Sequence, residues 1–505
     1  MRLLFSIALL FLCLHVPSLH AQLTPQEALQ QMGRGINLGN TLEPPEEGGW
    51  NNPPAEEFYF DAYKTAGFST VRIPVRWDKH TADTFPYTVD PAWMARVEQV
   101  AGWGLDRGFF VIINAHHEEW LKSNYTSVDT VARFHAIWRQ IAEHFKDKSD
   151  HLLFEIINEP YGMTVDQVDE LNADVLAIIR ESNPTRIVIY SGNRWSNTEE
   201  LMAAKIPDDD YIMGYFHSYN PWNFAGKGEG TWGTAADKAA VRNRFSTVAG
   251  WAKDHNLAIM ISEFGAVNSC DFNSRMRFYG CYVRNALLNG IPFMVWDDGG
   301  QFAVYARRDH LWYPPKDIVI YTTPASPDDL RGLDSEEGIR LQWANHGTYR
   351  QLVLERGLSL QEMDTVAGLP PDTSVWTDTP SVAGVYYYRL KALTQDSTPA
   401  WSPPYRIYYG ATGISSAGDT KISIFPNPLP AGRFLHISTG PLLPGEEYLY
   451  ELYNTTGALV AAGTIRGRSG QQVIAAGPTA RRPGTYLFIL KKEEQNIFST
   501  KVVFR

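Results

Sequence analysis

The chain reads Leu152-Leu153-Phe154-Glu155-Ile156-Ile157-Asn158-Glu159-Pro160, an apolar run that ends in a polar turn. A short run of this kind predicts a strand buried on both faces of a parallel sheet. Proline has no N–H to donate, and it disfavours helical geometry at the residue before it. We therefore expect the strand to end here, with the Glu159 carboxylate at its rim.

Seven other apolar runs of similar length lie between Met32 and Gly300. Segments with apolar residues at helical spacing separate them, for example 91–107, 130–145 and 242–255. Eight buried strands that alternate with helices predict a (β/α)8 TIM barrel, which we place at residues 22–323. An open doubly wound sheet would give the same alternation, but no glycine-rich phosphate loop follows the first strand. The other seven predicted strands are 35–38, 70–75, 109–114, 186–190, 211–216, 258–262 and 292–296.

The pattern changes after Pro324, where polar and apolar residues alternate between turn-rich segments. Such alternation predicts half-buried antiparallel strands. We therefore expect a small all-β sandwich, similar to fibronectin type III, at residues 324–409. Residues 410–421 are rich in Gly, Ser, Thr and Ala, as in a linker, and a second all-β sandwich is predicted at 422–505.

The composition argues against several classes of partner. Charged residues make up 20% of the 505 residues and apolar residues 44%, which is typical of folded domains. The formal net charge is -11 and no basic block occurs, so neither nucleic acid nor an anionic membrane surface is an expected partner. We expect a monomer without a transmembrane segment. Aromatic residues reach 13% of the chain, and their faces suit sugar rings, although they fill cores equally well.

The N-terminus predicts a secretory signal peptide at residues 1–21. Arg2 provides the positive end, residues 3–14 form a short apolar run, and Ala21 is a small residue suited to cleavage. Cys13 raises the alternative of a lipoprotein anchor, but Leu12 stands before it where a small residue is expected. We therefore expect the protein to be secreted or attached to the cell surface.

Two cysteines remain in the mature chain, Cys270 and Cys281. An oxidising compartment permits a disulfide between them, and two free thiols are equally compatible with a fold that needs no covalent crosslink. Both interpretations stay open.

Two glutamates stand at the ends of predicted barrel strands. Glu159 follows strand four, and Glu263 follows strand seven in Ile261-Ser262-Glu263-Phe264-Gly265. A carboxylate directly after an apolar run is costly to bury unless it is paired or used. The C-terminal ends of barrel strands meet at the face where active sites form. Helix capping or salt bridges would be the structural alternative for both glutamates.

Seven motifs, in order and each at a strand end, resemble glycoside hydrolase family 5, the cellulase family. The resemblance covers most of residues 33–299 and implies a barrel that hydrolyses β-linked polysaccharide with two carboxylates and no cofactor. Retaining enzymes of this kind hold the carboxyl groups about 5–5.5 Å apart. The motifs are Gly35-Ile36-Asn37-Leu38-Gly39-Asn40, Val71-Arg72-Ile73-Pro74-Val75, Ala115-His116-His117-Glu118, Ile157-Asn158-Glu159-Pro160, His217-Ser218-Tyr219-Asn220-Pro221, Ser262-Glu263-Phe264-Gly265 and Val295-Trp296-Asp297-Asp298-Gly299.

The resemblance implies a role for each matching residue. Glu159 is expected to be the acid and later the base, and Glu263 the nucleophile. Arg72 would hold the Glu263 charge by a bidentate hydrogen bond, or would form a purely structural salt bridge. Tyr219 would orient Glu263, and Asn158 would contact the 2-hydroxyl of the sugar.

Further residues are expected to line the cleft. His116 and His217 would surround the two carboxylates, and Trp296 would form the floor under the reacting sugar, with core packing as its alternative. Trp222 is the residue we expect to stack on a sugar beyond the scissile bond. Trp50, Trp77, Trp120 and Trp232 also fall in predicted loops or just after strands, and their roles stay undecided.

The run His116-His117-Glu118-Glu119 resembles a metal-binding motif. Adjacent residues of a strand point to opposite faces, so we expect these two histidines not to share an ion. No His-Glu-x-x-His helix is present either. We expect no metal at the site, with His117 packed or hydrogen-bonded behind it.

An endo-β-1,4-glucanase that cuts cellulose-like, mixed-linkage or xyloglucan chains is the favoured function. A β-mannanase of the same fold is one alternative, and a non-catalytic glycan-binding protein is another. The C-terminal module resembles the sorting domain of the type IX secretion system of Bacteroidetes, through Ile424-Phe425-Pro426-Asn427-Pro428 and Pro483-Gly484-Thr485-Tyr486. The resemblance implies that the type IX machinery is a partner; a generic carbohydrate-associated β-sandwich is the alternative.

Overall fold

The computed structural model describes residues 22–335, 337–382 and 384–409. In the C-terminal part it describes 422–425, 435–439, 446–454, 459–466, 470–474, 484–492 and 495–504. The predicted signal peptide with Cys13, and the predicted linker 410–421, lie outside the described residues. Within the described residues no helix combines the length and the apolar character that a membrane span requires.

Eight parallel strands close into a barrel in the order in which they occur along the chain. Strands β1 and β8 pair with each other and complete the ring. The predicted TIM barrel is therefore confirmed, with all eight strands at the expected places. The strands are β1 (Arg34–Asn37), β2 (Thr70–Ile73), β3 (Phe110–Asn114), β4 (Leu152–Glu155), β5 (Val188–Tyr190), β6 (Ile212–Ser218), β7 (Ala258–Phe264) and β8 (Phe293–Val295).

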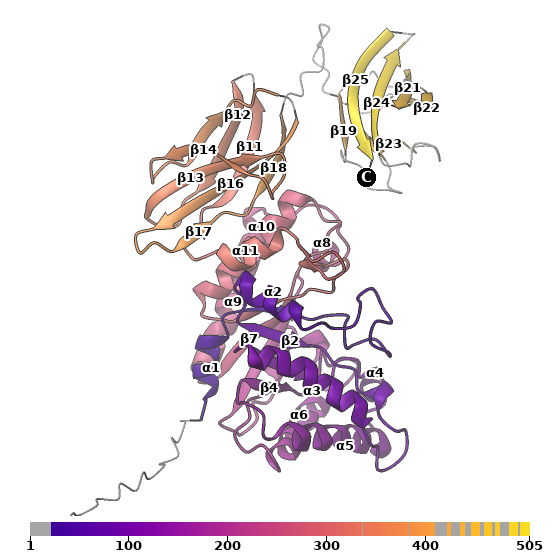
Figure 1. Ribbon diagram of the computed structural model, residues 1–505, viewed down its shortest axis with the longest axis vertical. Helices are drawn as coiled ribbons and strands as arrows, with labels where there is room; N and C mark the ends of the chain where they lie inside the picture. The colour runs from indigo at the N-terminus through magenta and orange to yellow at the C-terminus, as the bar shows by residue number, and fades with distance from the viewer. Residues whose placement is uncertain are drawn as a thin grey trace, which may run out of the picture. The chain divides into compact units, whose positions relative to one another are not determined.

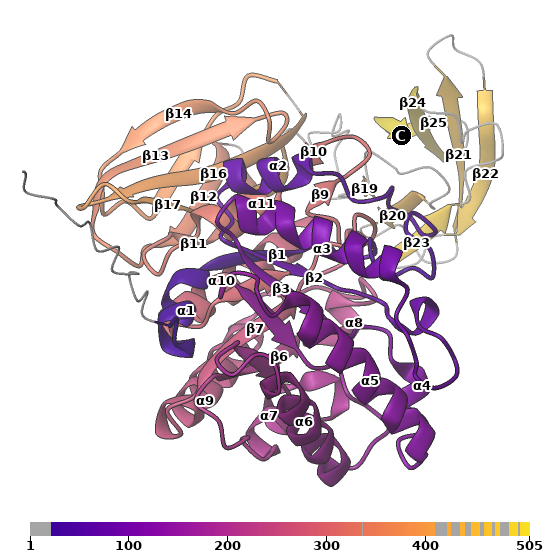
Figure 2. The same cartoon turned by 60° about the horizontal axis from the view of Figure 1, so that its bottom comes forward.

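Amphipathic helices surround the strands (Figures 1 and 2). Several begin at side-chain caps, for example Thr164 before α6, whose hydroxyl and the Gln167 side chain close a reciprocal capping box. The long helices are α2 (Phe58–Ala66), α3 (Pro91–Asp106), α5 (Val128–Phe145), α6 (Val165–Arg180), α9 (Ala235–Asp254) and α10 (Phe272–Leu288). The shorter ones are α1 (Pro25–Met32), α4 (Glu119–Lys122), α7 (Thr198–Ala203), α8 (Trp222–Ala225) and α11 (Pro315–Tyr321), with 3-10 turns η1 (Asp78–His80) and η2 (Arg194–Ser196).

The barrel has an apolar interior at the end where its strands begin. Ile112 of β3 and Leu153 of β4 pack there in one cluster with Ala28 and Met32 of α1. The helix α1 thus closes the bottom of the barrel with apolar side chains. A second, larger apolar cluster contains the outward-facing strand residues and the helices around them.

Further β-sheets follow the barrel, in line with the expected all-β region. One sheet has the order β11-β12-β15, and another has the order β14-β13-β16-β17 with β18 paired to β16. Burial alternates along β12, as predicted for a half-buried strand. The strands are β11 (Asp328–Ser335), β12 (Gly338–Ala344), β13 (Tyr349–Gly357), β14 (Asp364–Leu369), β15 (Val375–Asp378), β16 (Gly384–Thr394), β17 (Pro399–Trp401) and β18 (Tyr405–Tyr409); the hairpin β9 (Tyr305–Ala306) with β10 (Leu311–Trp312) precedes them.

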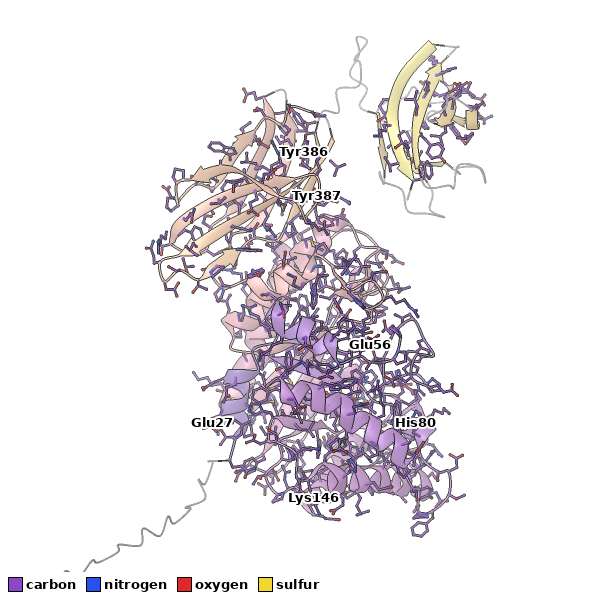
Figure 3. All side chains as sticks on the ribbon, viewed as in Figure 1. Glu27, Glu56, His80, Lys146, Tyr386 and Tyr387 are labelled. Atoms are coloured by element: carbon purple, nitrogen blue, oxygen red, sulfur yellow. The ribbon has the colours of Figure 1, made fainter. Side chains whose placement is uncertain are left out.

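Two barrel helices contact the sheet of β13 and β16. Arg389 of β16 donates to Asp317 of α11 at 3.2 Å, and the rings of Tyr321 and Trp401 stack with centroids 3.9 Å apart. Tyr387, labelled in Figure 3, meets Phe272 of α10 edge to face. These contacts join the sheet to the last helices of the barrel.

The C-terminal strands form two further antiparallel sheets, β19-β20-β23 and β22-β21-β24-β25. Their buried side chains, which include Phe488 and Leu490, form an apolar core of their own. The predicted domain limits at 324, 410 and 422 stay predictions. The strands are β19 (Ile422–Phe425), β20 (Leu435–Thr439), β21 (Glu447–Asn454), β22 (Leu459–Arg466), β23 (Gly470–Ile474), β24 (Gly484–Lys492) and β25 (Gln495–Phe504).

Candidate active site

A buried polar layer lies inside the barrel at the ends of its strands. Side chains two positions apart on a strand face the same side. Above the apolar Ile112 and Leu153 therefore come Asn114 and Glu155, both fully or almost fully buried. Polar groups in such a place need hydrogen-bond partners, and the sequence provides these from the neighbouring strands.

Arg72 of β2 lies in the middle of this layer and uses all five of its N–H donors. Its Nε and Nη2 donate to Glu155 at 2.7 and 2.6 Å. Its Nη1 donates to Glu263 at 2.6 Å and to Asn37 at 2.9 Å. The second N–H of Nη2 reaches Asn158 Oδ1 at 2.8 Å. Glu155 and Glu263 together outweigh the effect of burial and raise the pKa of Arg72.

The expected bidentate bond between Arg72 and Glu263 is wrong. The two parallel bonds of the guanidinium go to Glu155, and Glu263 receives a single N–H. The physical reason is that the Nε–Nη2 edge of the guanidinium faces β4, from which Glu155 points inward. Arg72 is thus both a structural ion pair and a contact of Glu263.

Glu159 and Glu263 face each other across this end of the barrel. One carboxylate oxygen of each lies within 4.8 Å of the other and of a ring nitrogen of His217. His217 Nδ1 is 2.7 Å from Glu159 Oε1 and 3.5 Å from Glu263 Oε2. Its other ring nitrogen is 3.0 Å from Ser262 Oγ, which fixes the ring. The hydroxyl of Tyr219 donates to Glu263 Oε2 at 2.8 Å.

The local backbone brings both carboxylates to this position. The register of β7 shifts against both neighbouring strands close to Glu263. Such an irregularity changes the direction of the side chains at the end of the strand. Glu159 has the left-handed φ of 44°, which is uncommon for a residue with a side chain. The hydroxyl of Tyr215 accepts from Glu159 N and donates to Ile157 O, and so holds this turn.

The two carboxylates differ in their surroundings. The Glu263 side chain is 6% exposed, whereas that of Glu159 is 25% exposed. Burial raises the pKa of Glu263, while His217 and Arg72 oppose this rise. Burial and the charge of Glu263 hold the pKa of Tyr219 well above its usual range, so its hydroxyl remains a donor.

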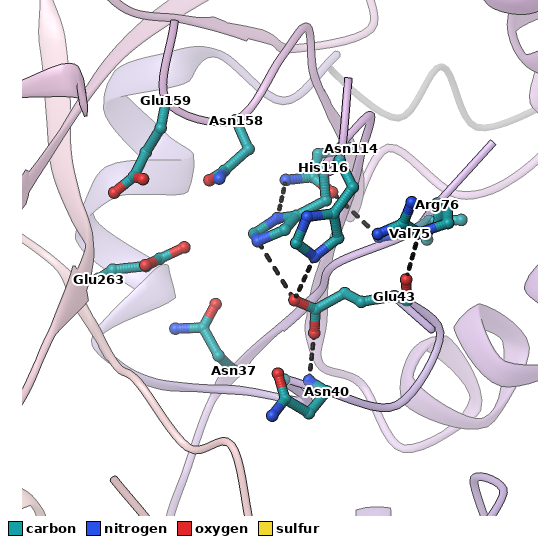
Figure 4. Close-up of polar contacts among 12 residues, drawn as sticks. Asn37, Asn40, Glu43, Val75, Arg76, Asn114, His116, Asn158, Glu159 and Glu263 are labelled. Atoms are coloured by element: carbon teal, nitrogen blue, oxygen red, sulfur yellow. Dashed lines mark hydrogen bonds and ion pairs between the residues drawn. The ribbon is translucent and has the colours of Figure 1, made fainter. Parts of the chain in front are cut away.

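Beside this pair, His116 (Figure 4) and His117 both lie against Glu43. The two Nε2 atoms lie 3.3 and 3.4 Å from Glu43 Oε1. The expectation that the two rings point apart is therefore wrong, because β3 ends at Asn114 and the backbone that carries the histidines is no longer part of a strand. The side-chain amide of Asn114 contacts His116 Nδ1 at 3.1 Å.

The two histidines differ in their charge. Burial lowers the pKa of His116 well below its usual range, so this ring is neutral. Burial also lowers the pKa of His117, but the carboxylates of Glu119 and Glu43, 3.7 and 3.4 Å from its ring nitrogens, outweigh burial and raise the pKa to about 9. A protonated His117 therefore pairs with Glu43. The same three groups could also hold a metal ion by their donor types.

The predicted tryptophans fall into different environments. Trp296 is partly buried and its ring stacks parallel to that of His116, with centroids 5.9 Å apart. Trp222 is 53% exposed at the start of α8 and meets Tyr219 edge to face. Trp77 and Trp232 are buried in the core, Trp120 is partly buried against it, and Trp50 is exposed at the surface.

The structure adds residues that the sequence did not single out. Glu155 and Asn37 contact Arg72, and Glu43 contacts both histidines. Trp195 is 59% exposed and stacks on Tyr161, two residues after Glu159. Polar residues inside otherwise apolar strands were the available signal for Glu155 and Asn37. No comparable signal marked Trp195.

Cys270 and Cys281 are free thiols, so the disulfide interpretation is wrong. Cys270 precedes α10, and Cys281 lies within this helix, about 13 Å along its axis from the first residue Phe272 at 1.5 Å per residue. A disulfide needs Cα atoms about 4.4–6.8 Å apart. The thiol of Cys270 contacts Phe224 O instead, at 3.1 Å.

A TIM barrel with two facing carboxylates at the ends of β4 and β7 is the arrangement of a glycoside hydrolase. The family model for cellulases, glycosyl hydrolase family 5, matches residues 29–301. The chain belongs to this family.

Individual relatives agree with this assignment. Endoglucanase H of Acetivibrio thermocellus is 45% identical over 326 residues, which cover 64% of this chain and 34% of that protein. The chain thus spans about a third of the length of that curated relative. A tri-modular family 5 (subfamily 4) endo-β-1,4-glucanase from Bacillus licheniformis has a solved structure with a TM-score of 0.64 and 26% identity, covering 95% of this chain and 100% of that one. Cel5A of Thermotoga maritima, solved in complex with mannotriose, has a TM-score of 0.57 and 31% identity, covering 59% of this chain and 99% of that one.

Proposed function

We propose that the barrel is a retaining endo-β-1,4-glucanase that cuts cellulose-like, mixed-linkage or xyloglucan chains. The observation that carries the proposal is the approach of Glu159 and Glu263 within 4.8 Å, with no room for a water molecule between carboxylate and sugar as an inverting enzyme requires. The glucanase names of the relatives at 45% and 26% identity support the choice of glucan.

In the first step a Glu263 oxygen attacks the anomeric carbon of the bound sugar. The glycosidic C–O bond breaks, and the leaving oxygen takes the proton of the Glu159 carboxyl. The product is a neutral glycosyl ester on Glu263. Tyr219 and Arg72 each donate to a different oxygen of Glu263, so the carboxylate is held in one orientation before the attack.

In the second step the Glu159 carboxylate takes a proton from water, and the water oxygen bonds to the anomeric carbon. The ester bond breaks and Glu263 regains its charge. His217 lies against both carboxylates and keeps Glu159 aimed at the leaving oxygen in the first step and at the attacking water in the second. Asn158 is held by Arg72 through Oδ1, so its amide N–H groups are left to donate to the sugar 2-hydroxyl.

Trapping the ester tests this mechanism. A 2-fluoro glucoside or cellobioside with a good leaving group should label the enzyme once per chain, on the peptide that contains Glu263. The variant Glu159→Ala should be labelled as well, because the activated leaving group needs no acid. Labelling at another residue, or product release that is unchanged in Glu263→Ala, would contradict the proposal and favour the glycan-binding alternative.

A β-mannanase is the second candidate. The Thermotoga maritima relative was solved with mannotriose and also with cellobiose, so a barrel of this family can take both sugars. Reducing ends released from carboxymethylcellulose, mixed-linkage glucan and xyloglucan, measured against galactomannan, separate the two functions. Activity confined to galactomannan would replace the glucanase proposal.

We also propose that the protein is exported as a monomer, and that residues 422–505 direct it to the type IX secretion machinery and to release or cell-surface attachment. The sequence motifs of this module support the proposal. Expressing the full chain and a chain that ends at Tyr409 in a Bacteroidetes host, with and without a working type IX system, tests it. Equal amounts of both chains in the medium would argue against a sorting role. Light scattering of the purified enzyme tests the monomer.

A further inference from the structure

Glu155 is a fully buried carboxylate to which the two steps above give no task. It contacts neither Glu159 nor Glu263. Its oxygens accept two hydrogen bonds from Arg72 at 2.7 and 2.6 Å and one from the Asn114 amide at 2.8 Å. Whatever Glu155 contributes to the reaction therefore acts through Arg72 and Asn114.

Arg72 is a buried cation that is shared by two anions. Its side chain is 0% exposed and pairs with Glu155 and Glu263 at 2.6 Å each. Glu263 loses its negative charge when it forms the glycosyl ester and regains it when the ester is hydrolysed. A buried cation whose only partner becomes neutral is strongly unfavourable, because no water replaces the lost anion.

We infer that Glu155 is a positioning residue, the permanent counter-ion of Arg72 that allows Glu263 to transfer its charge to the sugar. The Arg72–Glu155 pair stays intact through both steps, so the formation of the ester leaves no unpaired charge in the barrel. The inference deepens the proposed retaining mechanism and rests on it.

The geometry of the guanidinium supports the same role. Glu155 takes the Nε–Nη2 edge of Arg72, so that only one N–H, from Nη1, points to Glu263. A guanidinium that is not held in this way is free to offer two parallel bonds to Glu263. That arrangement would stabilise the charged carboxylate before the reaction and would slow its attack, because binding the ground state more tightly raises the barrier.

The variant Glu155→Gln tests the inference, because it removes the charge and keeps the shape. We expect kcat to fall at least 100-fold while KM stays within about threefold of the wild-type value, since Glu155 does not contact the sugar. The acidic limb of the kcat/KM profile should move to lower pH. In this variant Glu263 is the single anionic partner of Arg72, so the charged form of Glu263 is favoured. Labelling by the 2-fluoro glycoside should slow in the same proportion as kcat.

Glu355→Gln is the matched control. Glu355 forms a largely buried pair with Arg389, at 2.8 Å, in the sheet of β13 and β16. Its loss should lower the thermal stability without moving kcat or the pH profile. If Glu155→Gln behaves in the same way, with kcat within tenfold of wild type and an unmoved acidic limb, Glu155 is only structural and the inference is overturned.

Glu155→Asp keeps the inference testable if the glutamine variant does not fold. It retains the negative charge, so kcat should stay within about tenfold of wild type with the acidic limb in place. A loss of 100-fold or more in this variant would overturn the inference. Failure of the wild-type enzyme to be labelled on Glu263 would instead refute the retaining mechanism itself, so the two failures are distinguishable.

Discussion

The hydroxyl of Tyr219 lies 2.8 Å from Oε2 of Glu263, on the carboxylate oxygen that Arg72 does not contact. Each oxygen of this carboxylate thus has one donor, and the side chain cannot rotate without losing both.

Replacing Tyr219 by Phe should lower kcat about 10- to 100-fold, because Glu263 loses the donor that holds its attacking carboxylate in one orientation. KM should change little, because Glu263 keeps its single bond to Arg72. Steady-state kinetics on carboxymethylcellulose measure both values. A variant with wild-type kcat would show that Arg72 alone is enough to orient Glu263.

The acidic limb of the activity profile should lie above pH 4.5, the usual pKa of a glutamate, because burial raises the pKa of Glu263. The enzyme needs this carboxylate charged, so activity falls as the pH drops through the raised pKa. The measurement is kcat/KM between pH 3 and 8 in buffers of constant ionic strength. A limb well below pH 4.5 would mean that Arg72 and His217 outweigh burial.

Thermal stability should also depend on pH through His117, whose pKa in the folded state is raised to about 9 from an ordinary 6.5. A raised pKa means that folding favours the protonated ring. Its stabilising effect is therefore complete below pH 6.5 and is lost as the pH rises through about 9. Melting temperatures of wild type and His117→Gln should converge over this range. Parallel curves would refute the ion pair with Glu43.

Activity should persist in a chelator such as EDTA, because the proposed steps use only side chains and water. Among the described residues, two groups have the donor types of a metal site: Glu159 with His217 and Glu263, and the cluster of Glu43, His116 and His117. Activity that is lost in EDTA and restored by a divalent ion would contradict the metal-free mechanism. If the ion binds at this cluster, His117→Gln should no longer respond to it.

The exposed ring of Trp222 should bind sugar beyond the scissile bond. We expect Trp222→Ala to raise KM about threefold to tenfold with little change in kcat, since one aromatic contact is worth about 0.5–1.5 kcal/mol. Trp376→Ala is the matched control, because Trp376 is a partly exposed tryptophan on β15, outside the barrel. Equal effects of the two variants would exclude a specific subsite at Trp222.

The sequence was sufficient for the barrel because its strands are buried on both faces and read as continuous apolar runs. It also marked Glu159 and Glu263, since a charged residue directly after such a run has few structural explanations. The sequence predicts the end of α9 but not its start, because the first turn after Thr234 carries little apolar periodicity, although Thr234 and Asp237 form a capping box.

The sequence could not predict which partner each polar group chooses. We expected Arg72 to form its two parallel hydrogen bonds with Glu263, but its Nε and Nη2 atoms donate to Glu155. The two histidines were expected to diverge, but the strand that would separate them ends at Asn114. The first error concerns strands distant in the chain, whose relative placement follows from barrel closure, and the second concerns the residue at which β3 ends, which the local pattern does not define.

The inward-facing side chains of the barrel strands are apolar near the strand starts and polar at the strand ends, and this has a practical consequence. Ile112 and Leu153 pack with α1 at one level, and Asn114 and Glu155 form the polar level two residues later. Volume-conserving aliphatic substitutions in the apolar level can therefore be used to raise thermal stability without changing the hydrogen bonds of the polar level. Libraries that vary only the aliphatic residues at the apolar level would leave the polar side chains of the active site unchanged.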